Sequence, residues 1–216
     1  MDVRAQILDA ATRLFAAQGY GGTSLSAISA AVGVRKASLL YHFPSKDALH
    51  RAVLDNLLSH WNEVLPRLLE AAAGDDRFDA LLHETVRFFL ADPDRARLLL
   101  REALDRPEAM RARLRVAVKP WMEVIAEYVR KGQAQGELRA DADPEGYLLS
   151  VVHLVIGGIA TADTLGVVLD DEGRTERLVH EIERMAKTSL FTDEGLAASR
   201  ARRAARDDDD EHRAAE

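Results

Sequence analysis

Apolar residues recur at helical spacing along almost the whole chain, and this pattern limits the folds that the sequence can adopt. In the first segment Val3, Ile7, Leu14 and Phe15 fall on one face of a helix with 3.6 residues per turn. No stretch alternates apolar and polar residues for long enough to indicate a β-sheet. The sequence therefore predicts an all-α protein.

Glycines, prolines and helix-capping residues divide this pattern into about nine helices. We expect them near residues 3–18, 24–32, 36–42, 46–72, 77–91, 93–105, 107–133, 143–165 and 173–190. Pro120 lies inside the seventh span, where it either kinks one helix or marks the start of a second.

Two of the short helices are separated only by Val32-Gly33-Val34, which predicts a helix-turn-helix centred on residues 24–43. Ile28 and Leu39 are spaced to hold the two helices against each other. The outward positions of the second helix carry hydrogen-bond donors, small side chains and one amphipathic ring, namely Arg35, Lys36, Ala37, Ser38, Tyr41 and His42. This chemistry suits a helix that enters the major groove of DNA.

Charge is distributed unevenly between the two ends of the chain. Residues 1–51 contain six lysines and arginines against three acids, whereas residues 52–216 contain 23 against 33. A small basic head on an acidic body is typical of a protein that touches phosphate at one end only.

The runs TSLSAI at 23–28 and GVRKASLLYHFPSKDAL at 33–49 closely resemble the tetracycline-repressor (TetR) family. ILDAA at 7–11 and Leu14-Phe15 in the first helix match as well, so the resemblance covers residues 3 to about 60. It implies an all-α homodimer with a C-terminal domain for ligand binding and dimerisation. It also implies a DNA contact for each of Thr23, Ser24, Arg35, Lys36, Ala37, Ser38, Tyr41, His42 and Lys46.

The resemblance assigns these residues different roles. Thr23, Ser24 and Lys46 would contact phosphate at helix starts, where the helix dipole favours an anion. Residues 35–38 would approach the bases, and residues 41–42 the backbone. The family commonly has Tyr at the position of Leu40; because Leu cannot donate a hydrogen bond to phosphate, we expect Leu40 to pack.

We therefore divide the chain into a helix-turn-helix domain at 1–46, an effector-binding and dimerisation domain at 47–192, and a tail at 193–216. The tail is charged and has few large apolar side chains, so we expect it to be disordered. The helices at 147–165 and 173–190 are assigned to a four-helix dimer interface, as the resemblance also implies. The alternative for the first is a core helix within one chain.

The longest apolar run, Tyr147–Leu169, is long enough to span a bilayer. It contains His153, Asp163 and three glycines, and no basic residue flanks it closely, so we interpret it as a buried helix. The N-terminus lacks the pattern of a secretory signal. We expect a cytoplasmic protein without a membrane partner.

An effector pocket is expected among the helices between residues 46 and 133. Aromatic and polar side chains are candidates to line it: Trp61, Phe88, Phe89, Arg101, Trp121, Tyr128 and His153. For the aromatic residues, a place in the ordinary core is the alternative.

Catalytic and metal sites are not indicated. The chain has no cysteine, and its histidines lack metal-ligand spacing. No Walker loop, dinucleotide motif or nucleophile elbow is present, so we expect no cofactor. The sequence thus favours a ligand-responsive repressor that binds a palindromic operator as a homodimer and is released by a small-molecule effector. An enzyme and a helical protein-interaction module are the alternatives.

Overall fold

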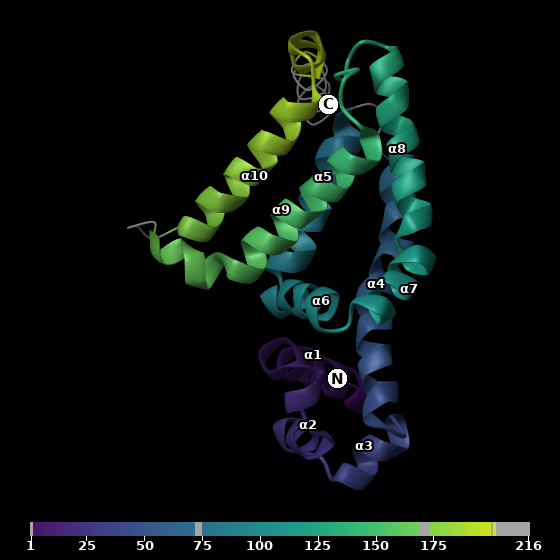
Figure 1. Cartoon of the computed structure of the whole chain (residues 1–216), viewed down its shortest axis with the longest axis vertical. Helices are drawn as coiled ribbons and strands as arrows, with labels where there is room; N and C mark the ends of the chain where they lie inside the picture. The colour runs from purple at the N-terminus through teal and green to yellow at the C-terminus, as the bar shows by residue number, and fades with distance from the viewer. Residues whose placement is uncertain (1, 72–74, 169–172, 200, 202–216) are drawn as a thin grey trace, which may run out of the picture.

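Three helices form one end of the molecule, the head (residues 2–45), and glycine and side-chain caps set where these helices begin and end (Figure 1). They are α1 (Val3–Gly22), α2 (Leu25–Val32) and α3 (Lys36–His42). Gly19 has a φ of 71° inside α1, so regular helix ends there, as predicted, and a last turn continues to Gly22. The computed structural model describes residues 2–71, 75–168, 173–199 and 201.

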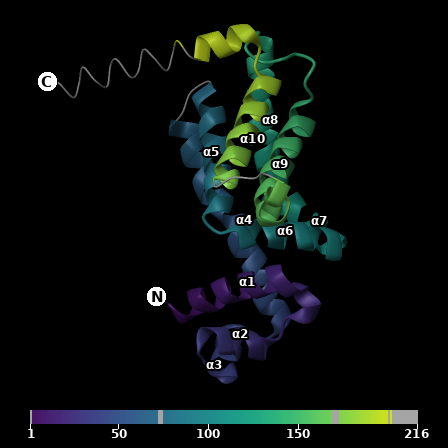
Figure 2. The same ribbon diagram turned by 90° about the vertical axis from the view of Figure 1, so that its left-hand side faces the viewer.

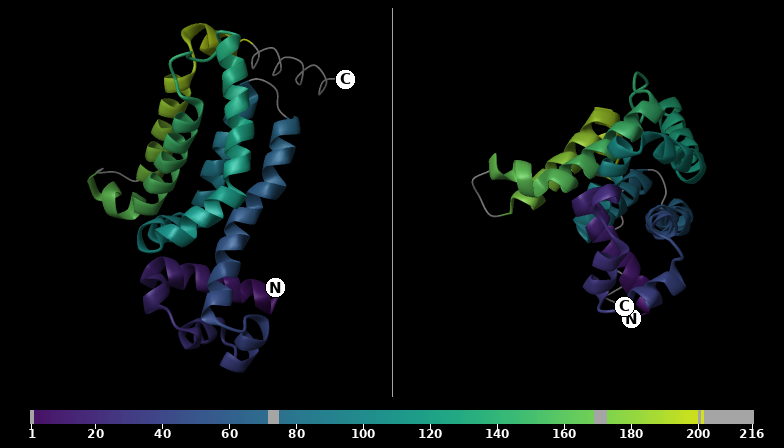
Figure 3. Two further views of the ribbon diagram at one scale, coloured as in Figure 1. Left: turned by 45° about the vertical axis from the view of Figure 1, so that its right-hand side comes forward. Right: turned by 60° about the horizontal axis from the view of Figure 1, so that its bottom comes forward.

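The long helix α4 (Lys46–Ala71) leaves the head and runs along the remaining helices, the body (Figure 3, left). Ser45 caps it, because its Oγ accepts a hydrogen bond from the backbone N–H of Ala48 at 3.1 Å. Pro66 lies inside α4, and the helix continues through it.

Prolines lie in the first turn of four of the body helices, where the backbone N–H that proline lacks would have no partner within the helix. In order the body contains α5 (Asp75–Leu90), α6 (Pro93–Asp105), α7 (Pro107–Ala117), α8 (Lys119–Ala134), α9 (Pro144–Leu165), the 3₁₀ helix η1 (Gly166–Val168) and α10 (Arg174–Leu190). Pro120 marks a second start, so the predicted 107–133 helix is two helices. In the described residues no β-strand forms beyond one isolated bridge between Leu138 and Phe191. The all-α prediction is confirmed.

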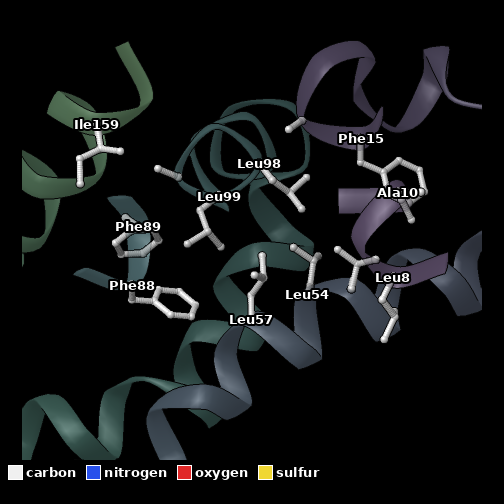
Figure 4. Close-up of a cluster of buried hydrophobic side chains, with 14 of the residues drawn as sticks. Leu8, Ala10, Phe15, Leu54, Leu57, Phe88, Phe89, Leu98, Leu99 and Ile159 are labelled. Carbon is white, nitrogen blue, oxygen red and sulfur yellow. The ribbon is translucent and has the colours of Figure 1, made fainter. Parts of the chain in front are cut away.

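One buried cluster runs without a break from the head into the body (Figure 4). Leu8 and Phe15 of α1 pack beside Leu54 of α4 and Leu98 of α6, and the cluster continues to Ile159 of α9. Apolar burial stabilises a fold by roughly 25 cal/mol per Å², so head and body share one source of stability.

Helix α9 packs beside α10 (Figures 1 and 2), and side chains of α10 approach it closely at Gly158. A Cβ at Gly158 would lie 2.8 Å from Ile182 Cδ1, whereas one at Gly157 would meet nothing within 4 Å. Only one side of α9 is covered. Within one chain, 17% of its most apolar window is buried, so the alternative of a core helix within one chain does not describe its outer face. By length and a mean hydropathy of 1.8, Pro144–Val168 also meets the criteria for a candidate membrane span, which a core helix can meet too.

The first part of the predicted tail is ordered. Residues 193–199 are helical, and the N–H of Leu196 donates to the carbonyl of Thr192 at 2.9 Å. Leu196 packs against a small cluster that contains Leu190 and Phe191, which explains why this segment folds. Apart from residue 201, the rest of the predicted tail lies outside the described residues.

Candidate nucleic-acid interface

A left-handed glycine sets the angle between α2 and α3. Gly33 ends α2 with φ 76° and ψ 23°, and its N–H donates to the carbonyl of Ala30 at 3.2 Å. Ile28 and Leu39 are fully buried between the two helices. The helix-turn-helix predicted from these residues is present.

Helix α3 exposes almost all of its surface. Leu39 is its only buried residue. Arg35, Lys36, Ala37 and Ser38 are exposed, and Tyr41 is 86% exposed with its ring edge-on to His42 at 5.4 Å. An outward helix with these side chains has the size and the donors to read base edges in a major groove.

The starts of α2 and α4 lie at the same end of the molecule as α3 (Figure 3, right). Ser24 is exposed, and its Oγ accepts from the N–H of Ala27 at 3.0 Å. Lys46 is the first residue of α4. Both positions combine unpaired backbone N–H groups with the positive end of a helix dipole, as an anion site requires.

Thr23 is a correction to the predicted site. Its side chain is 2% exposed, and its Oγ1 donates to the carbonyls of Gly19 at 2.9 Å and Leu14 at 3.0 Å. Gly19 disrupts the end of α1, and Thr23 satisfies the carbonyls left there. The hydroxyl of Thr23 is therefore not free to meet phosphate.

Leu40 is a second correction. We expected it to pack, yet it is 36% exposed on α3. With Leu39 turned into the core, the helical repeat directs the next residue outward. Leu40 thus lies on the candidate surface as an apolar group.

The junction between head and body contains functional candidates that the sequence did not indicate. His50 Nε2 lies 2.9 Å from Glu102 Oε1, and Arg106 Nη1 lies 3.2 Å from His50 Nδ1. Tyr20 donates its hydroxyl to Asp47 at 2.7 Å, and this hydrogen bond raises the pKa of Tyr20. The partners are up to 56 residues apart in sequence, so no local pattern links them.

The predicted effector residues are brought together only in part. The rings of Trp61 and Phe88 lie 5.2 Å apart, and those of Phe88 and Phe89 lie 5.0 Å apart. Trp121 Nε1 donates to Asn62 at 2.7 Å. The guanidinium of Arg77 stacks on the ring of Tyr128.

Arg101 and His153 do not join the aromatic cluster. Arg101 Nε donates to the carbonyl of Ala16 at 3.0 Å, because the break at Gly19 leaves α1 carbonyls open. His153 is exposed on α9, since the helical repeat that buries Val155 turns it outward.

Two surface hollows accompany these residues. One of about 310 Å³ lies beside the aromatic cluster, and Asn56, Leu57, Ser59, His60, Glu63, Phe88 and Arg95 line it. The other, of about 470 Å³, lies on the outer face of α9, and Leu149, Ser150, His153 and Leu154 line it. Among the described residues, no group of three or more His, Cys, Asp or Glu side chains is placed to hold a metal ion.

Comparison with known proteins identifies both parts of the chain. Residues 7–53 match the family described as bacterial regulatory proteins, tetR family, and residues 75–189 match the tetracyclin repressor-like C-terminal domain. The chain is 30% identical over 112 residues to IcaR, a negative transcriptional regulator of a biofilm operon in Staphylococcus epidermidis, which is 51% of this chain and 58% of IcaR. It is 33% identical over 136 residues to the transcriptional regulator LmrA of Bacillus subtilis, which is 60% of this chain and 72% of LmrA.

A solved structure shows the same fold over most of its length. The structure of AibR in complex with isovaleryl coenzyme A and operator DNA superimposes with a TM-score of 0.68 at 23% identity, covering 85% of this chain and 97% of AibR. Family models thus match both the head and the body, and together they cover most of the chain. The chain belongs to the TetR family of bacterial transcriptional regulators, which bind DNA and are not enzymes.

Proposed function

We propose that this protein is a homodimeric repressor that binds a palindromic operator and is released by a small-molecule effector. The observation that carries the DNA-binding part is the outward surface of α3, where Leu39 alone is buried and Tyr41 is 86% exposed. The proposed DNA contacts come from three helix starts and one exposed helix face, and they are Ser24, Arg35, Lys36, Ala37, Ser38, Tyr41, His42 and Lys46.

Dimerisation is proposed through the outer faces of α9 and α10. Leu149, Leu154 and Met185 are exposed there, and Gly157 leaves room for a close neighbour. Exposed apolar side chains on two packed helices of a protein of this family fit a second copy of the chain. Two heads related by a two-fold axis would read the two halves of a palindrome.

Effector control is proposed through α4. Phe88 lines the hollow beside α4, and its ring packs against those of Trp61 and Phe89. Helix α4 continues into the head as one helix. A ligand that binds one arrangement of these helices better than another shifts the population toward it. The spacing of the two heads would then change, which releases DNA. A cytoplasmic location follows from these partners.

Selection of bound duplexes from a random library, followed by footprinting, tests the DNA-binding part. We expect a palindrome with half-sites about one helical turn apart. Absence of binding to any duplex at low salt contradicts the proposal and favours a helical interaction module.

Tryptophan fluorescence tests the effector part, because Trp61 and Trp121 are the two tryptophans of the chain. A metabolite that quenches this fluorescence is expected to weaken binding to the selected duplex. A confirmed ligand that leaves DNA affinity unchanged argues against control by that ligand.

A further inference from the structure

We propose that Tyr20 is a positioning residue for Lys46, and that Arg106 holds Tyr20 in place from the body. The body would thereby influence how tightly the head binds the phosphates of DNA. This inference rests on the proposed function, which gives Lys46 a phosphate contact.

The ammonium group of Lys46 lies on an aromatic ring. Lys46 Nζ is 4.3 Å from the centroid of the Tyr20 ring. Such a contact contributes about 0.5–1 kcal/mol at an exposed site, and it occupies no oxygen acceptor, so N–H groups remain available for phosphate. Ordering a free lysine side chain costs up to about 2 kcal/mol of rotamer entropy. A Lys46 that is already restrained therefore loses less entropy when DNA binds.

The hydroxyl of Tyr20 strengthens this contact. It donates to Asp47 Oδ1 at 2.7 Å, and Asp47 directly follows Lys46 in the first turn of α4. A phenol that donates to a carboxylate has a more electron-rich ring, which attracts a cation more strongly. The same hydrogen bond fixes the ring against the start of α4.

Arg106 holds the same ring from the body. Its Cζ lies 4.3 Å from the centroid of Tyr20, and it follows the last residue of α6. Its Nη1 also contacts His50 Nδ1 at 3.2 Å. A guanidinium group only donates, so Nδ1 accepts, and His50 Nε2 carries the hydrogen toward Glu102 Oε1.

These contacts form one connected path from α6 to the start of α4. Glu102 and Arg106 belong to α6 and its C-terminal cap, His50 lies one turn into α4, and Tyr20 joins them to Lys46. A movement of α6 relative to α4 would move Arg106, and the restraint on Lys46 would change with it.

The dependence of DNA affinity on salt tests the proposal, because it counts phosphate contacts. The probe is the duplex that the wild-type protein selects from a random library, with affinity measured by fluorescence anisotropy across a salt series. Lys46→Ala is expected to lower the slope of log affinity against log salt by about 0.9 per lost contact. Tyr20→Leu leaves Lys46 able to reach phosphate but no longer restrained, so it is expected to weaken binding by about 2- to 5-fold with a smaller change of slope, and to have no further effect in the Lys46→Ala background.

Two further variants separate positioning from a purely structural role. Tyr20→Phe keeps the ring without the hydroxyl, so it should fold normally and give an affinity between those of the wild type and Tyr20→Leu, even where Tyr20→Leu unfolds. Arg106→Gln should weaken binding in the wild-type background and have no effect in Lys46→Ala. Arg115→Gln, which removes an exposed charge on α7, is the matched control and should change neither value. Circular dichroism during heating reports the folding of each variant.

An unchanged affinity in folded Tyr20→Leu and Tyr20→Phe overturns the inference, as does tighter binding, which would mean that the ring withholds Lys46 from DNA. If Lys46→Ala leaves the slope unchanged while the wild type binds, the inference fails and DNA binding stands. If the wild type selects no duplex, the proposed function itself fails.

Discussion

His50 Nε2 and Glu102 Oε1 meet at 2.9 Å where α4 leaves the head, and both side chains are buried. The rings of Phe15 and Tyr20 lie edge-on to the His50 ring, with centroid distances of 4.8 Å and 5.0 Å. A buried carboxylate is tolerated when a donor satisfies it. The pair therefore binds head and body through a polar contact inside an otherwise apolar core.

Glu102→Gln is expected to lower the free energy of unfolding by about 1–3 kcal/mol, since it replaces a charged acceptor of a buried hydrogen bond. Urea denaturation measures the change. Glu108→Gln is the control, because Glu108 pairs with Arg111 on the surface, and such pairs contribute about 0–1 kcal/mol. Equal stability of both variants would show that the buried pair contributes no more to the free energy of unfolding than the surface ion pair does.

Gly33→Ala should destabilise the helix-turn-helix by about 1–2 kcal/mol, the cost of a left-handed backbone for a residue with a Cβ. An added Cβ there would meet nothing within 4 Å, so the backbone alone carries the cost. Gly21→Ala also meets nothing, and its φ is not positive, so it should be neutral or slightly stabilising. Chemical denaturation compares the two, and similar stabilities would contradict the argument.

Leu154→Glu should shift the protein from dimer to monomer, because it places a charge on the proposed interface of α9. Leu104→Glu, at an exposed position on α6, is the control and should leave the dimer intact. Sedimentation velocity at several concentrations distinguishes the two states. A Leu154→Glu protein that stays dimeric locates the interface elsewhere.

Tyr147→Phe should reduce the loss of stability in alkaline solution. Burial raises the pKa of Tyr147 well above its ordinary range, and its hydroxyl donates to the carbonyl of Ala186. The neutral phenol thus stabilises the fold fully below about pH 10, the pKa of an unfolded tyrosine, and this contribution is lost as pH rises through the folded pKa.

The free energy of unfolding of the variant should be lower by about 1 kcal/mol at neutral pH. It should fall less steeply than that of the wild type above pH ~10. The pKa of Tyr20 is raised as well, so part of the alkaline dependence should remain. Unfolding experiments across a pH series provide the measurement, and identical alkaline curves for variant and wild type would exclude this role for Tyr147.

Tyr41→Phe should weaken DNA binding by about 0.5–1.5 kcal/mol, and by the same amount on every duplex, if its hydroxyl donates to phosphate. Ser38→Ala is the comparison, since a residue that faces base edges should lose affinity mainly on duplexes with the preferred base. Competition binding with a panel of point-substituted duplexes measures both. A sequence-selective loss in Tyr41→Phe assigns it to the bases instead.

Local patterns were sufficient for the helices and for the helix-turn-helix. Gly33 and Leu39 act on neighbours a few residues away, so their roles are visible in the sequence. Pro120 left two outcomes open, because proline both kinks a helix and starts one, and only the packing of α8 decides. The hydroxyls of Thr23 and Ser24 can each cap a helix, and only the folded chain directs Thr23 to the end of α1 and Ser24 to the start of α2.

Long-range contacts could not be predicted in the same way. Arg101 is a candidate for the pocket because polar groups orient ligands, yet it contacts Ala16, 85 residues away. His153 follows a helical repeat that fixes its direction only once the covered side of α9 is known. Tyr20 carried no distinguishing pattern, because its partners come from two different helices.

The core that continues from Phe15 to Ile159 bears on how such regulators can be recombined. A chimera joined at residue 46 would combine an α1 and an α6 that were never selected to fit each other, and its interior would contain gaps or clashes. Exchange of operator specificity is therefore better achieved by replacing only the outward residues of α3, which leaves every interlocking surface of the original protein in place.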